Sequence, residues 1–168
     1  MPAEAPPHIR LLATADAAAY REVRLEGLQQ NPEAFGSSFA FENAQPVAWF
    51  AERIAGSEIF GAVAGDQLLG VAGYRQLDGP KQRHKGLLWG MYVRGSARQS
   101  GLGERLVEAV IEHASGRIEQ LSLTVVVENA SARRLYEKLG FVEYGREKHA
   151  LKQDGRYYDE ILMVRFLI

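Results

Sequence analysis

Residues 87–103 carry the strongest structural signal in the chain, and they read LLWGMYV, RGSARQS and GLG in succession. The first seven residues form an apolar run that predicts a strand, with Gly90 as a candidate β-bulge inside it. The next seven form a polar turn, and the glycines after it open a helix predicted to run from about Gly101 to Ala114. Since a helix begins with free backbone N–H groups and a partial positive charge, this turn is a candidate phosphate site.

The residue types in the turn suit an anion. Gly101 and Gly103 let the backbone approach a phosphate without an intervening side chain, and Arg98 adds a permanent cation. Two known phosphate loops are excluded, because the Walker lysine is missing and Leu106 stands where the dinucleotide fingerprint needs a third glycine. Taken alone, the glycine pair is more typical of a tight turn before a capped helix.

A second informative segment follows farther along the chain. Residues 121–127 are almost wholly apolar, which predicts a strand buried on both faces. Residues 128–141 read ENASARRLYEKLGF, where Asn129 can cap a helix over 130–139 and Gly140 can end it. Tyr136 lies on this helix, and the segment by itself is also compatible with an ordinary capped helix that packs a tyrosine.

The rest of the chain supplies the remaining elements of one domain. Thr14 can cap a first helix that Asn31 stops, and Pro46 opens a second helix that Gly56 ends. Between them, residues 35–42 predict a loop or short helix. Further strands are predicted at residues 9–13, 59–64, 68–77, 141–151 and 157–167. The order is βααββ, then βαβα, then ββ, which favours an α/β fold with a mixed sheet and helices on both faces.

Composition limits the class of protein. The chain has 168 residues, of which 46% are apolar and 24% charged, so we expect a single domain over 9–168 after a disordered tail at 1–8. A net charge of −1 does not indicate a nucleic-acid or membrane partner. The absence of cysteine removes disulfides and thiolate metal sites. No apolar run approaches the roughly 20 residues that span a bilayer, and we expect a cytoplasmic protein without a metal.

Taken together, residues 98–103 and 129–141 resemble the two cofactor motifs of the GNAT family of N-acetyltransferases. The first matches Arg-x-x-Gly-x-Gly, and the second matches Asn-x-x-Ala-x-x-Leu-Tyr-x-Lys-Leu-Gly-Phe. The element order after Ile9 also agrees, so the resemblance covers nearly the whole chain. Gly95 stands where the family usually has proline, and Gln99 where glycine is common. Neither departure removes a phosphate donor, because backbone groups carry that role.

The resemblance implies a mostly antiparallel central sheet and transfer of an acetyl group from acetyl-CoA to a primary amine by direct attack. It implies that the backbone of Met91 and Val93 binds the pantetheine arm, that Asn129 touches this arm, and that Tyr136 protonates the leaving sulfur. The cofactor-binding residues that it implies are Met91, Tyr92, Val93, Arg98, Gln99, Ser100, Gly101, Leu102, Gly103, Glu104, Asn129, Arg133, Tyr136 and Lys138.

The acceptor side is less defined by the sequence. Phe35, Phe39 and Glu42 are candidate acceptor-binding residues, since rings give an apolar wall and a carboxylate selects a cationic amine. Glu42 is also a candidate catalytic base, with Glu26, His149 and Asp159 as alternatives. Each of these candidate bases suits a structural or solvated role better than a catalytic one, and the rings suit the core at least as well as a pocket wall.

Two functions therefore stay open at this point. The acceptor of an active N-acetyltransferase would be a small-molecule or peptide amine. The alternative is a non-catalytic acyl-CoA-binding sensor or scaffold module. Retention of Tyr136 favours the enzyme, because binding alone needs no proton donor. The resemblance is compatible with a homodimer, although no residue pattern establishes one.

Overall fold

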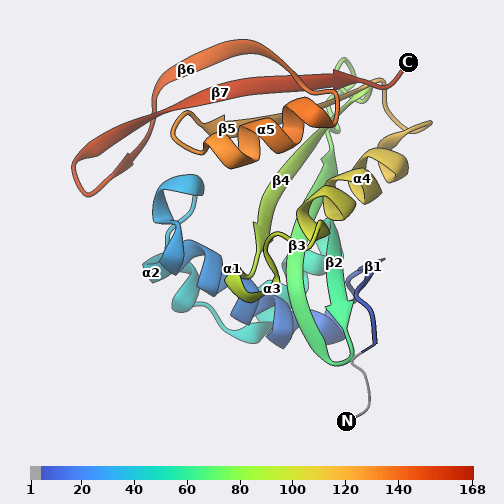
Figure 1. The fold of residues 1–168 in the computed structure, drawn as a ribbon, viewed down its shortest axis with the longest axis vertical. Helices are drawn as coiled ribbons and strands as arrows, with labels where there is room; N and C mark the ends of the chain where they lie inside the picture. Colours follow the sequence, from blue (N-terminus) through green and yellow to red (C-terminus); the bar gives the residue numbers. More distant parts are fainter. Residues whose placement is uncertain (1–4) are drawn as a thin grey trace.

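The computed structural model describes residues 5–168 and has a seven-stranded sheet in the order β1-β2-β3-β4-β5-β7-β6 (Figure 1). The strands are β1 (His8–Leu11), β2 (Glu58–Ala64), β3 (Gln67–Gln76), β4 (Lys85–Val93), β5 (Gln120–Val126), β6 (Val142–Gln153) and β7 (Arg156–Phe166). All neighbouring pairs are antiparallel except β4 and β5, which are parallel. The mixed, mostly antiparallel sheet that the resemblance implies is confirmed.

Helices cover both faces of this sheet. They are α1 (Ala17–Gln30), α2 (Phe39–Asn43), α3 (Val47–Gly56), α4 (Leu102–Ala114) and α5 (Ala130–Lys138). Side chains alternate between the two faces of a strand, so Val71 of β3 packs with α1 and α3, whereas its neighbour Ala72 packs with α4 and α5. In the part of the chain that the structure describes, no helix is both long and apolar enough to cross a bilayer.

The amino-terminal region differs in detail from the sequence expectations. Residues 1–4 of the predicted tail lie outside the described residues, and His8 already belongs to β1. Thr14 begins a 3-10 turn instead of capping α1, and the Asp16 carboxylate accepts the backbone N–H of Ala13 at 2.7 Å. Asp16 also pairs with Arg10 at 2.8 Å, which ties β1 to the start of the helical layer.

The two central strands separate partway along their length. β4 pairs with β5 only from Lys85 to Leu87. Just beyond, Gly90 and Met91 together face a single residue of β3, and Gly90 has a φ of +62°, which confirms the predicted bulge. The prediction that β5 is buried on both faces is wrong at Thr124. This residue is exposed at the point where β4 no longer pairs with β5. The sheet is therefore open between the far ends of β4 and β5.

Candidate functional site

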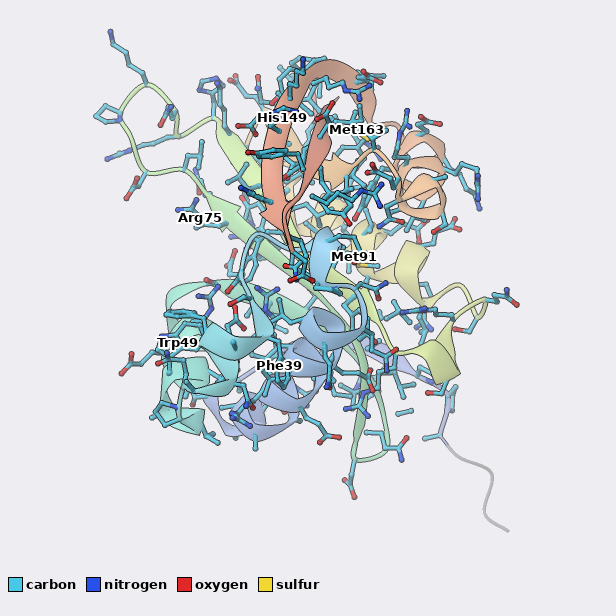
Figure 2. The ribbon with its side chains drawn as sticks, turned by 90° about the vertical axis from the view of Figure 1, so that its left-hand side faces the viewer. Phe39, Trp49, Arg75, Met91, His149 and Met163 are labelled. Atoms are coloured by element: carbon cyan, nitrogen blue, oxygen red, sulfur yellow. The ribbon has the colours of Figure 1, made fainter. Side chains whose placement is uncertain are left out.

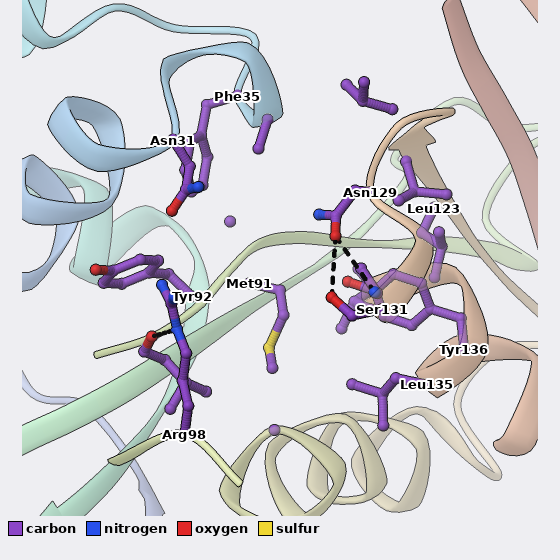
Figure 3. Close-up of a pocket in the computed structure, with 18 of the residues that line it drawn as sticks. Asn31, Phe35, Met91, Tyr92, Arg98, Leu123, Asn129, Ser131, Leu135 and Tyr136 are labelled. Carbon is purple, nitrogen blue, oxygen red and sulfur yellow. Dashed lines mark hydrogen bonds between the residues drawn. The ribbon is translucent and has the colours of Figure 1, made fainter. Parts of the chain in front are cut away.

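A cavity of about 530 Å³ occupies this opening (Figure 3). Residues 88–93 of β4 and 123–126 of β5 form its sides, and the turn before α4 and the first turns of α5 complete it. Asn31 and Phe35 line it from the opposite side to Asn129 and Tyr136. Its volume is in the range of pockets that bind small molecules and cofactors.

The turn before α4 presents unpaired backbone donors to the cavity. Gln99 and Gly101 both have positive φ, at 63° and 79°, and these values turn the chain sharply into the helix. The N–H of Arg105 makes the first helical bond, to the carbonyl of Gly101 at 3.1 Å. The amides of Leu102, Gly103 and Glu104 precede that bond and so have no carbonyl partner within the helix. This geometry suits an anion, as the sequence predicts.

Arg98 belongs to the same turn and lines the cavity. Its Nε donates to the carbonyl of Val93 at 3.1 Å, and its guanidinium carbon lies 5.7 Å from the centre of the Tyr92 ring. No carboxylate among the described residues pairs with it. The positive charge of Arg98 is therefore oriented by neighbours that do not neutralise it.

The opposite wall holds Asn129 and Tyr136. Asn129 Oδ1 accepts the N–H of Ala132 at 3.3 Å, which confirms the predicted cap of α5. Tyr136 is only 6% exposed, and its ring packs edge-to-face with that of Phe141, with the ring centres 5.9 Å apart. Burial raises the pKa of the Tyr136 hydroxyl above its ordinary value of about 10. The hydroxyl is therefore protonated at neutral pH, as a proton donor requires.

Four expected cofactor residues do not line the cavity: Ser100, Glu104, Arg133 and Lys138. The Ser100 hydroxyl donates to the carbonyl of Ala97, and Arg133 lies 3.9 Å from Glu143. Lys138 Nζ lies 2.7 Å from a Glu104 oxygen and joins α5 to α4. Side-chain contacts of these residues with a cofactor stay predictions.

On the acceptor side, the structure separates the three expected residues. Phe35 lines the cavity, whereas Phe39 packs partly buried in the helical layer (Figure 2). Glu42 does not line the cavity, and its carboxylate is 1% exposed and paired with Arg24 at 3.0 Å. We therefore correct the expected role of Glu42, because a carboxylate held by a buried guanidinium is not placed to deprotonate an amine in the cavity.

The other candidate bases, Glu26, His149 and Asp159, also lie outside the cavity wall. Glu26 accepts the Tyr92 hydroxyl at 3.0 Å. Asp159 accepts the N–H of His149 at 2.9 Å and bonds Arg146 at 2.8 Å, and these contacts hold its pKa below the usual value. Among the described residues that line the cavity there is no carboxylate and no imidazole.

Several polar residues of the cavity escaped the sequence reasoning. Asn31 was read only as a helix stop, and Ser131 only as part of a helix, but both line the cavity. Thr124 is one of two polar residues, with Ser122, in the predicted apolar strand that begins at Leu121 and ends at Val127, and of these two only Thr124 lines the cavity. Within residues 5–168, no group of three or more histidines and carboxylates could hold a metal ion.

Comparison with known sequences agrees with this site. The model of the acetyltransferase (GNAT) family matches residues 20–141. The L-amino acid N-acetyltransferase AaaT of Escherichia coli (strain K12) is 26% identical over 165 residues, which cover 94% of this chain and 96% of that protein. The L-methionine sulfoximine/L-methionine sulfone acetyltransferase of Pseudomonas aeruginosa is 30% identical over 141 residues, which cover 78% of this chain and 81% of that protein.

Solved structures share the fold. A GNAT acetyltransferase from Streptococcus pneumoniae superposes with a TM-score of 0.84 at 23% identity, covering 96% of this chain and 99% of the other. The yncA protein of Salmonella typhimurium, solved with acetyl-CoA as its cofactor, superposes with a TM-score of 0.80 at 20% identity, covering 98% and 95%. Since the family model spans well over half of the sequence, this chain belongs to the acetyltransferase (GNAT) family.

Proposed function

We propose that this protein is an N-acetyltransferase that moves the acetyl group of acetyl-CoA to the primary amine of a small molecule or peptide. The observation that carries the proposal is the cavity between β4 and β5. It is lined at one end by the start of α4, which is suited to a phosphate, and at the other by Tyr136, whose hydroxyl is protonated. The curated relatives support the reaction class, since both act as acetyltransferases on amino acids or their analogues by their names.

The chemistry of the cavity wall supports acetyl-CoA as the cosubstrate. The free amides at the start of α4 would hold the pyrophosphate, with Arg98 as a neighbouring cation. The unpaired edge of β4 beyond Leu87 offers the backbone of Met91 and Val93 to an extended amide-bearing arm. Asn129 faces the same space and completes the binding wall.

Acetyl-CoA supplies an activated acyl group, so that the C–S bond breaks as the new C–N bond forms. The chain must then stabilise negative charge on the carbonyl oxygen and provide a proton to the departing sulfur. We assign the first task to a backbone N–H near Met91, at the bulge. We assign the second to Tyr136, whose hydroxyl is buried and protonated.

The acceptor amine has to lose a proton before it attacks. A primary amine such as that of lysine has a pKa of about 10.4, so most of it is charged at neutral pH. Because the described residues of the cavity wall include no carboxylate or imidazole, we propose that water molecules carry this proton away from the amine. The side-chain amide of Asn31 is one polar group that lines the cavity on the acceptor side.

The decisive experiment measures acetyl transfer from acetyl-CoA to a panel of amino acids, their amides, a polyamine and short peptides, with hydrolysis without acceptor as the baseline. Transfer to at least one primary amine, slowed roughly 10²-fold in Tyr136→Phe, is the expected result. Tight acetyl-CoA binding without transfer to any amine of the panel would overturn the assignment as an enzyme. It would support a non-catalytic acyl-CoA-binding module instead. Sedimentation of the same sample tests the homodimer that the resemblance allows.

A further inference from the structure

Arg24 of α1 is a buried cation, and only some of its hydrogen-bond donors have partners. It is 6% exposed, and its Nε and Nη2 contact the Glu42 carboxylate at 3.0 to 3.3 Å. Its remaining nitrogen, Nη1, has no hydrogen-bond partner among residues 5–168. The fully buried side-chain polar atoms that lack a partner do not include Nη1. Since Nη1 has no partner either, it must be accessible and border open space.

Arg24 does not itself line the cavity, but two residues beside its guanidinium, Gly90 and Phe35, do. A Cβ built on Gly90 would lie 3.5 Å from Arg24 Nη1, and Gly90 itself lines the cavity at the bulge of β4. The Arg24 guanidinium also lies 5.1 Å from the centre of the Phe35 ring, another residue of the cavity wall. Because Gly90 has no side chain, a ligand atom can occupy the position that a Cβ would take and reach Nη1.

The surrounding charges favour an anion at this position. Arg53 stacks 5.5 Å from the centre of the Trp89 ring, which also lines the cavity, and no salt bridge to it is found within residues 5–168. Both Arg24 and Arg53 act electrostatically on the nearby Tyr20, and Glu42 is the carboxylate that acts on the same group. Around Tyr20, two guanidiniums therefore face one carboxylate.

We propose that Arg24 Nη1 binds the carboxylate of the acceptor, and that the acceptor is a free α-amino acid. The inference rests on the proposed function and names the acceptor class for the same cavity. Glu42 acts as a positioning residue, since its two-atom contact fixes the plane of the guanidinium and leaves one edge for the ligand. A peptide amine lacks this carboxylate and would leave Nη1 without a partner.

The experiment compares L-methionine with L-methioninamide as acceptors, at saturating acetyl-CoA and one pH, in the parent, Arg24→Lys and the double variant Arg24→Gln/Glu42→Gln. The amide has a less basic amine, so the readout is the ratio of kcat/KM for acid and amide across variants. We expect this ratio to fall at least about 10-fold in both variants, through the KM of the acid. Arg24→Lys keeps a cation for Glu42, but the single ammonium group has no further N–H-bearing nitrogen to offer the ligand.

Arg21→Lys is the matched control. Arg21 lies on the same helix and bonds the carbonyls of Asn43 and Gln45, and its guanidinium lies over the Phe50 ring, which is not part of the cavity wall. The ratio measured for Arg21→Lys should therefore equal that of the parent. A ratio unchanged within about 3-fold in folded Arg24 variants overturns the inference.

Calorimetry on the parent separates this inference from the proposed function. L-methionine should bind the protein with CoA at least about 10-fold more tightly than L-methioninamide, and equal affinities overturn the inference even where the variants do not fold. If the parent binds the acid selectively but acetylates no amine, the proposed function fails while the carboxylate site stands.

Discussion

The cavity between β4 and β5 and the helical layer of α1, α2 and α3 both hold polar side chains in apolar surroundings, but they treat them differently. In the helical layer, the Glu42 carboxylate is paired within the fold by Arg24. Around the cavity, the amides that open α4, the Arg98 charge and the Tyr136 hydroxyl have no such partner among the described residues. The difference predicts that removing a pairing partner within the helical layer lowers stability, whereas changes around the cavity alter binding and turnover. Arg24, which is paired in the layer and proposed to bind the acceptor, should affect both.

The largest effect should come from Glu42→Ala. It leaves the buried Arg24 without its counter-charge, and breaking a buried pair in this way costs about 3–5 kcal/mol. Urea unfolding of the purified variant measures the loss. Glu52→Ala, at an exposed position of α3, is the control and should unfold like the parent. A folded Glu42→Ala protein with parental stability would break the contrast between the two regions.

Tyr136→Phe should be next in size and should act on turnover alone. The ring stays and the proton donor goes, so kcat should fall roughly 10²-fold with acetyl-CoA affinity nearly unchanged. The matched control is Tyr74→Phe, since Tyr74 has a buried hydroxyl without a partner in the same hydrophobic cluster but does not line the cavity. Full kcat in Tyr136→Phe would show that water protonates the sulfur.

The pH profile of the parent sharpens the same assignment. An acid must be protonated to act, so its contribution persists below its pKa and disappears above it. Because burial raises the pKa of Tyr136, the rate should not fall between pH 7 and about 10 through loss of this proton. A basic limb near pH 8 that persists in Tyr136→Phe would assign the titration to another group.

Gly101→Val tests the phosphate end of the cavity. Gly101 has a φ of +79° and lines the cavity, so a branched side chain both strains the turn and obstructs an anion at the start of α4. We expect acetyl-CoA affinity to fall about 10-fold or more by calorimetry. Gly116→Val is the control, because Gly116 has a φ of +82° in open space outside the cavity. It should show similar strain and parental affinity, and equal losses in both variants would contradict the phosphate site.

The smallest effect is expected for Asp16→Asn, in the exposed part of the helical layer. The bonds from Arg10 and from the Ala13 N–H hold the pKa of Asp16 below its usual value, so its contribution is full above about pH 4 and is lost as pH falls further. Arg10 is partly exposed, and the loss should be at most about 1 kcal/mol. Urea unfolding at pH 7 and pH 3 measures it, and the gap between variant and parent should narrow at pH 3.

The same contrast explains which parts of the molecule could be predicted from sequence. The turn before α4 and the cap of α5 depend on residues that are adjacent in the chain, so Gly101 and Asn129 could be placed from local patterns alone. The partner of Glu42 lies 18 residues away on another helix, and no local pattern pairs them. The exposure of Thr124 depends on where β4 leaves β5, which only the packed sheet determines.

The short pairing of β4 with β5 also leaves two inner edges, because beyond Leu87 and Ser122 neither strand bonds the other. Free strand edges are templates for further strands, and on an outer rim they invite aggregation. Here they face each other inside the sheet, across the cavity that separates β4 from β5. In the proposed function the extended arm of the cosubstrate would lie between these edges as an additional strand does. Each turnover would therefore satisfy the free edge groups when the cosubstrate binds and expose them again when the product leaves.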